Sequence, residues 1–390
     1  MKILQVTKYY YPATSFGGPV QCTYNISKCL VEKGHEVTVY TTDAFDGKNS
    51  LKVGDKLQTI DGAEVFFFPN LVRAYGIFMS PSIIRAFQRK MQFDVVHLHE
   101  YRTFQNLTFH YFQRRKPSFV MSLHGEFPYS YPQDPWNVVF LRRLFDCVFG
   151  RRLLKDARRI LALTGFEASQ LIQSGVEKQK VAIVPNGIDP NEFSDLPPPG
   201  YFRKLFGISE EKIILYIGRL HKRKGLDVLL RAFSYLTKEQ KNTKLVIAGP
   251  DDGYLTALQK MTKSLGLGGK VLFTGALSRQ KVLAAFNDTT VTVYPSVHEG
   301  FAIVPLESGI MGKPIIVSDH PALNFVAQGK FGLTVERGNA LRMKSALQRI
   351  LEDDVLAREL GKNGKKFVMN NFTWDSIVNE IENLYREICD

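Results

Sequence analysis

The 390-residue sequence is poor in cysteine and has no long apolar run. Its four cysteines, Cys22, Cys29, Cys147 and Cys389, show neither the density of a disulfide-stabilised protein nor the spacing of metal ligands. We therefore expect free thiols in a reducing compartment, the cytoplasm. No apolar run reaches the roughly 18 residues that a membrane-spanning helix needs. Residues 1–6 form only a short apolar run, typical of a first strand rather than of a signal peptide.

Two common ligand-binding patterns are also missing. The spaced glycines G-x-G-x-x-G of a dinucleotide-binding loop do not occur, which disfavours an NAD-dependent enzyme. His97, His99 and His124 have no accompanying carboxylate or cysteine at metal-ligand spacing, so we expect no metal site. His97 is better explained as a hydrogen-bonded core residue. His124 is followed by glycine at a strand end and is the better functional candidate.

Positive charge is plentiful, with a net charge of +13, and in the first half it is concentrated in residues 138–159. This segment has seven Lys or Arg side chains against Asp146 and Asp156, and its apolar residues recur at helical spacing. An amphipathic basic helix can bind an anionic membrane surface. It can equally pack its apolar side on the core and expose its basic side. Both alternatives remain open, and Gly150 interrupts the pattern that membrane binding requires.

Short β-rich runs alternate with helical stretches throughout the chain. Many of the runs are continuously apolar, as strands covered on both faces are. The alternation predicts an α/β protein with parallel sheets and helices on both faces. The expected strands are residues 2–7, 36–42, 63–69, 94–99, 118–123, 159–164, 181–185, 212–218, 244–249, 271–275, 291–295, 314–318 and 332–336.

One stretch interrupts this alternation. Residues 186–211 contain Pro197-Pro198-Pro199-Gly200 and are typical of a linker between two doubly wound domains. Two domains are also the number expected for a chain of this length. We place the domains at residues 1–195 and 196–371, followed by a C-terminal helix at 372–390.

The first candidate ligand-binding loop contains Gly17 and Gly18. The following Pro19 suits the first turn of a helix, which we expect to run to about residue 34. Paired glycines let a ligand approach the backbone at that helix end. An ordinary turn explains them equally well.

The second candidate loop is the basic stretch 218–225, which follows an apolar strand. Arg219 can donate paired hydrogen bonds to a phosphate, and Lys224 supplies a point charge. A solvated basic turn is an adequate explanation for Lys222 and Arg223. We do not expect nucleic-acid binding, because aromatic residues do not alternate with the basic ones.

The third candidate stretch runs from Glu299 to Glu307. Pro305 suits the first turn of a helix, so Glu299 should lie on a loop and Glu307 in that turn. The N–H groups between them lie near a positive helix end and can accept an anion, while the carboxylates can bind hydroxyl groups. A solvated loop glutamate and a dipole-stabilised helix glutamate explain the same residues.

These motifs together resemble the retaining glycosyltransferases of family 4, within glycosyl transferases group 1, which have the GT-B fold. The resemblance covers nearly the whole chain. Besides the three loops it rests on His97-Leu98-His99, Leu123-His124-Gly125, Val184-Pro185-Asn186-Gly187-Ile188-Asp189 and Phe372-Thr373-Trp374. The glutamate pair with Arg219 and Lys224 upstream makes it specific. Ala302 stands where the family commonly has glycine and should add a methyl group beside the donor.

The resemblance implies a nucleotide-sugar donor bound mainly by residues 196–371, facing an acceptor-binding domain at 1–195, to which the helix at 372–390 returns. Arg219 and Lys224 would hold the diphosphate and Glu307 the ribose hydroxyls. The remaining implied donor contacts are Glu299, Gly300 and Phe301 at the sugar, Ile303 and Val304 at the phosphates, Ala276 and Lys281 near the base, and Gly17 and Gly18 from the first domain.

On the acceptor side the resemblance implies His124 beside the anomeric carbon, with His99 and Glu126 nearby. Aromatic residues in 126–136 suit a sugar or an isoprenoid chain, although a packed loop explains them too. The implied reaction retains anomeric configuration without an enzymic nucleophile, because the donor phosphate helps to take the acceptor proton. No Asp-x-Asp motif is evident, which agrees with a site that needs neither metal nor cofactor.

We therefore expect an enzyme that transfers a hexose from a UDP- or GDP-sugar to a glycan or lipid-linked acceptor, in cell-surface polysaccharide or glycoconjugate assembly. Peripheral attachment to the cytoplasmic membrane face through 138–159 is a second expectation. The alternatives are a nucleotide-sugar epimerase or hydrolase on the same fold, a phosphorylase, or a polyanion-binding module.

Overall fold

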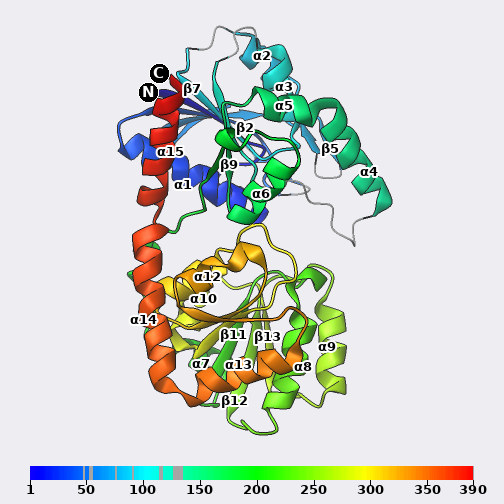
Figure 1. Ribbon diagram of the computed structural model, residues 1–390, viewed down its shortest axis with the longest axis vertical. Coiled ribbons are helices and arrows are strands. Elements are labelled where there is room, and N and C mark those ends of the chain that lie inside the picture. Colours follow the sequence, from blue (N-terminus) through cyan, green and yellow to red (C-terminus); the bar gives the residue numbers. More distant parts are fainter. Residues whose placement is uncertain are drawn as a thin grey trace. The chain divides into compact units, whose positions relative to one another are not determined.

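The computed structural model describes residues 1–46, 49–51, 56–74, 77–89, 92–113, 117–125 and 135–389. These residues form two compact units, Met1–Gly187 with Trp374–Asp390, and Ile188–Thr373. Each unit contains a mainly parallel sheet with helices on both faces (Figure 1). The predicted α/β architecture is confirmed.

The main sheet of the first unit has the strand order β10-β9-β8-β7-β1-β2-β4-β3. In the described residues β3 pairs antiparallel with β4, and the other neighbours in this sheet are parallel. The strands are β1 (Lys2–Val6), β2 (Glu36–Thr42), β3 (Leu57–Ile60), β4 (Ala63–Phe68), β7 (Val95–His99), β8 (Phe119–Ser122), β9 (Arg159–Ala162) and β10 (Val181–Ile183), with a separate hairpin of β5 (Val72–Ala74) and β6 (Ile77–Met79).

Helices cover both faces of this sheet because successive residues of its apolar strands point to opposite sides. Ile3 packs in the core beneath α1 and α15, whereas Leu4 packs in the core on the α2 and α5 side. The helices are α1 (Gly18–Glu32), α2 (Ser82–Gln88), α3 (Phe104–Phe112), α4 (Trp136–Phe145), α5 (Arg151–Asp156), α6 (Gly165–Gln173) and α15 (Trp374–Cys389).

The sheet of the second unit is entirely parallel in the described residues, with the order β13-β12-β11-β14-β15-β16. Its strands are β11 (Lys212–Ile217), β12 (Thr243–Ala248), β13 (Val271–Gly275), β14 (Val291–Tyr294), β15 (Ile315–Ser318) and β16 (Gly332–Val335). Its helices are α7 (Tyr201–Phe206), α8 (Leu226–Leu236), α9 (Leu255–Ser264), α10 (Arg279–Asp288), α11 (Val304–Ile310), α12 (Phe325–Gln328), α13 (Ala340–Glu352) and α14 (Asp354–Asn371).

Both sheets reverse their strand order beside the first strand. In the first unit β1 lies between β2 and β7, and in the second β11 lies between β12 and β14. Loops leaving adjacent strands diverge at such a switch point, which is where open α/β sheets bind ligands. The topology therefore predicts one ligand-binding position in each unit, at the carboxyl ends of the strands that flank the switch point.

Every strand expected from the sequence is present, with ends within two residues of the expected ones. The sequence did not reveal β3, β5 and β6, because β3 is a largely exposed edge strand and the other two have three residues each. The expected helices after Pro19 and around Pro305 are α1 and α11.

The expected linker at residues 186–211 is wrong for most of its length. Ile188 and Phe193 pack in the core of the second unit, and Phe202 of α7 is fully buried there against Phe286. The units therefore divide at 187/188 rather than at 195/196. They divide again at 373/374, where α15 begins beside α1 in the first unit (Figure 1).

The basic segment 138–159 forms α4, a five-residue π-helical turn at Asp146–Gly150, and α5. None of the α4 side chains is buried, and Leu141, Leu144 and Val148 are all about half exposed. The alternative in which the apolar residues pack in the core is therefore wrong for Leu141, Leu144 and Val148, whereas Phe145 packs against the core of the first unit. Gly150 has a structural role, because a side chain there would collide with the hydroxyl group of Tyr101. Within the described residues, no helix combines the length and apolarity needed to cross a bilayer.

Candidate functional site

The switch point of the second unit brings the loops after β11 and β14 together. Gly218 has a φ of +150°, and an added Cβ would lie 2.8 Å from Oη of Tyr216. Gly225 has a φ of +65°, and a Cβ there would collide with the carbonyl oxygen of Pro295. Glycine is thus required at 218 by its backbone angle and the nearby Tyr216, and at 225 so that the basic loop can run closely against the loop after β14.

Lys224 and Glu299 meet across these two loops. Nζ of Lys224 lies 2.7 Å from Oε2 of Glu299, and the two side chains are only 14% and 12% exposed. The same oxygen accepts hydrogen bonds of 2.9 Å from the hydroxyl groups of Tyr294 and Ser296. Burial, with the nearby Glu299 charge, raises the pKa of Tyr294 well above its ordinary value, which keeps the phenol protonated as a donor. The Glu299 carboxylate is therefore fixed from three sides.

Arg219 is far more exposed than Lys224. Its guanidinium lies 2.8 Å from Asp252, with side-chain exposures of 64% and 40%. An ion pair this exposed contributes little to stability, so Arg219 can exchange Asp252 for a bound anion at small cost. The backbone beneath it is held by Tyr216, whose hydroxyl donates to the Arg219 carbonyl oxygen at 3.0 Å.

Glu307 lies in the first turn of α11 and pairs with Arg279 of α10. Burial raises the pKa of Glu307, and the adjacent Arg279 opposes that shift. Arg279 also pairs with Glu192 at 2.9 Å and lies over the ring of Phe193. The sequence reasoning missed Arg279, because nothing in the linear pattern connects the start of α10 with the start of α11.

The backbone between the two glutamates offers unused donors. Among the described residues, no protein acceptor pairs with the N–H groups of residues 300–303 in the structure. Phe301 stacks on Phe325 with ring centroids 5.5 Å apart, which anchors this stretch. Ala302 is 2% exposed and belongs to the hydrophobic core.

Ala276 and Lys281 are the remaining donor-site candidates of the second unit. Ala276 is exposed directly after β13, and Lys281 is half-buried on α10, two residues beyond Arg279. They follow the strand at the edge of the sheet, whereas Lys224 and Glu299 follow its two central strands. Within the described residues, no cluster of three or more His, Cys, Asp or Glu side chains could hold a metal ion.

In the first unit, Gly17 and Gly18 begin α1. Gly17 has a φ of +73°, and a Cβ at either position would meet no atom within 4 Å. The loop therefore leaves the backbone open to close approach. At the switch point beside it, the ammonium of Lys8 lies 3.0 Å from the Glu100 carboxylate, with side chains 9% and 3% exposed.

A hydrogen-bonded chain of buried side chains leads to His124. The Gln5 amide donates to Oη of Tyr385 at 3.3 Å, so its carbonyl oxygen accepts from Nε2 of His99 at 2.5 Å. Nδ1 of His99 must then accept from Nε2 of His124, at 2.9 Å. Burial holds the pKa of His99 well below its ordinary value, so that ring is neutral. Gln5 therefore sets the tautomer of His124 through His99.

His97 completes this network as the structural residue that the sequence predicted. Its ring nitrogens lie 2.6 Å from Oη of Tyr385 and 2.7 Å from Oγ of Ser122, and burial lowers its pKa to about 3. His99 is also fully buried, with both ring nitrogens engaged, so it acts through His124 rather than on a ligand directly.

The loop after His124 is positioned by a carboxylate that the sequence did not reveal. Glu167 is fully buried in the first turn of α6 and accepts from the N–H groups of Gly125 at 3.0 Å and Leu163 at 2.7 Å. Thr164 caps the same helix, a Thr-x-x-Glu pattern that is visible in the sequence. Glu126, the remaining acceptor-side candidate, lies outside the described residues.

Two family models match the two halves of the chain. Residues 16–192 match the model of the Glycosyltransferase Family 4, and residues 201–367 match the model of Glycosyl transferases group 1. An uncharacterized glycosyltransferase of Methanocaldococcus jannaschii is 27% identical over 413 residues, covering 99% of this chain and 98% of the relative. The glycogen synthase of Mycobacterium tuberculosis is 24% identical over 405 residues, covering 99% and 94%.

Solved structures with the same architecture align over nearly the full chain. Sucrose-phosphate synthase from Thermosynechococcus elongatus has a TM-score of 0.77 at 19% identity, covering 99% of this chain and 98% of its own. Anabaena HepE, solved in complex with UDP-glucose, has a TM-score of 0.76 at 18% identity, covering 99% and 100%. With both halves matched by models of one enzyme class and relatives aligned end to end, this chain belongs to the glycosyltransferases of group 1 and has the GT-B fold.

Proposed function

We propose that this glycosyltransferase moves a hexose from a UDP- or GDP-sugar to a glycan or lipid-linked acceptor, with retention of anomeric configuration. The observation that carries the proposal is the arrangement of polar groups at the switch point of the second sheet, beyond the carboxyl ends of its strands. There a run of N–H groups without protein acceptors lies between two fixed carboxylates, beside Arg219 and Lys224. A nucleotide-diphosphate sugar has the matching chemistry, with an anionic centre and hydroxyl groups at both ends.

In the proposed complex, Arg219 and Lys224 neutralise the diphosphate together with the N–H groups of residues 300–304. Positive charge at this place stabilises the leaving group as its bond to the sugar breaks. Lys224 would exchange or share its contact with Glu299, which stays oriented by Tyr294 and Ser296.

The two glutamates take different parts of the donor in this proposal. Glu299 binds the sugar hydroxyls, and Glu307 binds the ribose hydroxyls while Arg279 holds its carboxylate in place. The base lies towards Ala276 and Lys281. With basic side chains at the diphosphate, the reaction proceeds without a metal ion, so chelation of divalent cations by EDTA should leave turnover unchanged.

The acceptor side of the proposal rests on the first unit. His124, fixed through His99 and Gln5, lies beside the anomeric carbon, and the open backbone at Gly17 and Gly18 approaches the diphosphate. The exposed apolar residues of α4 and the basic charge of 138–159 support attachment to the cytoplasmic face of an anionic membrane. An enzyme of polysaccharide or glycoconjugate assembly would meet a lipid-linked acceptor there.

A thermal-shift screen with UDP-, GDP- and ADP-sugars tests the donor class. A ligand at 100 times its dissociation constant should raise the free energy of unfolding by about 2.7 kcal/mol. We expect a UDP- or GDP-sugar to raise the melting temperature and the ADP-sugars to have a smaller effect. If no nucleotide sugar shifts the melting temperature, the proposed donor site is wrong.

A further inference from the structure

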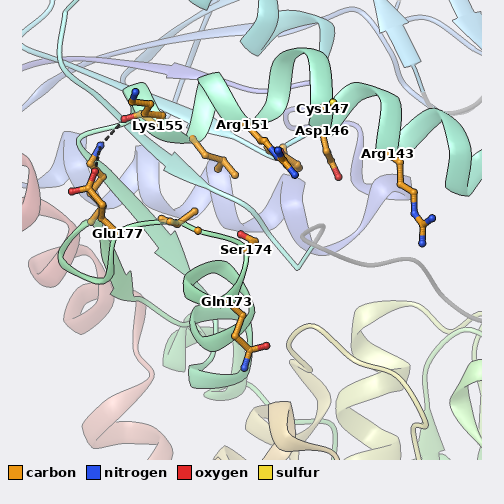
Figure 2. Close-up of a pocket in the computed structure, with 13 residues that line it drawn as sticks. Arg143, Asp146, Cys147, Arg151, Lys155, Gln173, Ser174 and Glu177 are labelled. Atoms are coloured by element: carbon orange, nitrogen blue, oxygen red, sulfur yellow. Dashed lines mark hydrogen bonds and ion pairs between the residues drawn. The ribbon is translucent and has the colours of Figure 1, made fainter.

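A pocket of about 830 Å³ in the first unit contains none of the proposed donor or acceptor residues (Figure 2). One wall is the helical segment of α4, the π turn and α5, which contributes Arg143, Cys147, Arg151 and Lys155. Residues four apart lie on the same side of a helix, so these four form one continuous face. The other wall is residues 173–177 and Lys180, at and after the end of α6. The volume is typical of a ligand site.

The two acidic side chains in this pocket are already paired. Asp146 accepts hydrogen bonds from the Arg102 guanidinium at 2.7 and 3.1 Å. Glu177, which is labelled in Figure 2, lies 3.8 Å from the ammonium of Lys180. The acidic groups therefore do not neutralise the remaining cations.

Three cations remain without a carboxylate partner. In the part of the chain that the structure describes, no Asp or Glu lies within ion-pair distance of Arg143, Arg151 or Lys155. Both arginines are exposed, so they can approach a ligand without a large rearrangement. The pocket thus offers an unbalanced positive face, and arginine is the side chain best suited to paired hydrogen bonds with a phosphate group.

An apolar stripe borders this positive face on the same helix. Phe140, Leu144 and Val148 each precede a pocket-lining residue by three positions, and residues three apart are neighbours on a helix surface. Their exposures are 57%, 48% and 51%, and Trp136 at the start of α4 is 82% exposed. So many large apolar side chains on one exposed helix mark an interaction surface.

We propose that this pocket binds the phosphate headgroup of an anionic phospholipid, while the apolar stripe enters the adjoining bilayer interface. Arg143 and Arg151 donate to the phosphate, and Lys155 adds positive charge. A free phosphate compound would use only the cations, whereas a lipid in a bilayer also explains the neighbouring stripe. This inference rests on the membrane attachment proposed above for residues 138–159 and names the group recognised there, but it does not depend on the identity of the donor.

Vesicle flotation of the full chain, without donor or acceptor, tests the proposal. The vesicles contain phosphatidylcholine either alone or with phosphatidylglycerol at three parts in ten. The protein should float only with the anionic vesicles. Arg143→Gln/Arg151→Gln should weaken that binding at least about 10-fold, since each basic side chain near an anionic surface contributes strongly to binding.

A matched variant separates a headgroup site from diffuse attraction. Arg152→Gln/Lys178→Gln removes the same charge from exposed residues of the same region that do not line the pocket. It should weaken binding only about 3-fold. Phe140→Ser/Leu144→Ser, which leaves the pocket charge intact, should release the protein from the vesicles. Thermal melts that match the wild type confirm that each variant is folded.

Three results would overturn the proposal. The first is a wild-type protein that fails to float with anionic vesicles. The second is an equal loss of binding in Arg143→Gln/Arg151→Gln and in the control variant Arg152→Gln/Lys178→Gln. The third is a Phe140→Ser/Leu144→Ser variant that binds like the wild type. Glycerol phosphate at millimolar concentration provides a further arm. It carries the same phosphate but no acyl chains, so it should compete only partly, because the apolar stripe adds affinity for the bilayer; full release from the vesicles would be a fourth contrary result, showing that the pocket binds a free phosphate compound.

Discussion

Both units place a lysine–glutamate pair at the switch point of their sheet, but the two pairs have different surroundings. Lys8 follows β1 and pairs with Glu100 directly after β7, and the side chains are 9% and 3% exposed. Lys224 follows β11 and pairs with Glu299 after β14, with side chains 14% and 12% exposed. The topology around the two pairs is equivalent, since each joins the first strand to the strand across the switch point.

Loop length explains the difference between the pairs. Lys8 and Glu100 lie within two residues of their strands, whereas Lys224 lies seven residues and Glu299 five residues beyond theirs. The longer loops of the second unit carry the exposed Arg219 and the N–H groups that lack protein acceptors. The two sheets therefore place a lysine–glutamate pair at the same position, and the length of the loops determines whether that position is a buried structural contact or an open binding site.

Replacing each lysine should give the largest difference between the two pairs. Lys224→Met removes charge from the proposed diphosphate site and should lower turnover about 10³-fold. Lys8→Met leaves Glu100 buried without its lysine and should lower the free energy of unfolding by about 3 kcal/mol. Turnover per folded molecule should change little in Lys8→Met.

Steady-state kinetics and urea unfolding of both variants measure these effects side by side. An equal loss of turnover in the two variants would contradict the division into a structural pair and a donor-binding pair. Lys8→Arg and Lys224→Arg serve as charge-preserving controls.

The hydrogen-bonded chain of the first unit should give a smaller effect. His124→Asn removes the proposed acceptor-side group and should lower kcat about 10²-fold. Gln5→Met removes the amide that fixes His99 and should lower kcat about 10-fold, because His124 is no longer held in one tautomer. Donor affinity should stay unchanged in both variants.

Tyr385→Phe tests the specificity of that chain. It removes the hydroxyl that bonds Gln5 and His97 but leaves the Gln5–His99 contact in place. It should therefore cost stability of about 1 kcal/mol and little turnover. A loss of turnover in Tyr385→Phe as large as in His124→Asn would contradict the assigned order of the chain.

The pH dependence of stability should give the smallest difference between the units. Burial lowers the pKa of His97 to about 3, while an unfolded histidine titrates near 6.5. Between these values the unfolded chain binds more protons, so stability falls as the pH drops below 6.5. His97 should contribute about 1.4 kcal/mol per pH unit to that fall.

His221, on the open basic loop of the second unit, is the matched comparison. Burial also lowers its pKa, with Arg223 nearby. Urea unfolding at pH 5 and pH 6 should show that His97→Gln flattens the pH dependence more than His221→Gln. An equal pH dependence of the free energy of unfolding in the two variants would contradict the expectation that folding lowers the pKa of His97 more than that of His221.

The sequence was sufficient for the strands that are buried in the two sheets and for the residues of the second switch point, but not for β3, β5 and β6. Strands buried on both faces are continuously apolar, and Pro305, Gly218 and Gly225 act locally through backbone geometry, so all leave a readable signal. Sequence reasoning therefore found Glu299, Glu307 and the basic loop without knowledge of their contacts.

Contacts between distant segments left no such signal. Arg279 reaches Glu307 from another helix, and Gln5 reaches Tyr385 across 380 positions of the chain. The proline-rich stretch was mistaken for a linker because Phe202 and Ile208, which bury it in the second unit, are few and widely spaced. The exposure of α4 was undecidable as well, since an apolar stripe is the same pattern in a core and at a surface.

Calorimetric titration of Glu307→Ala and Glu299→Ala with a nucleoside diphosphate and with its nucleotide sugar tests the central claim most directly. The proposal predicts that Glu307→Ala weakens binding of both ligands about 10-fold, through loss of the ribose contact. Glu299→Ala should bind the bare nucleoside diphosphate nearly as the wild type does, but lose the added affinity for the nucleotide sugar. The reverse pattern, or unchanged binding in both variants, would contradict the placement of the donor between these two glutamates.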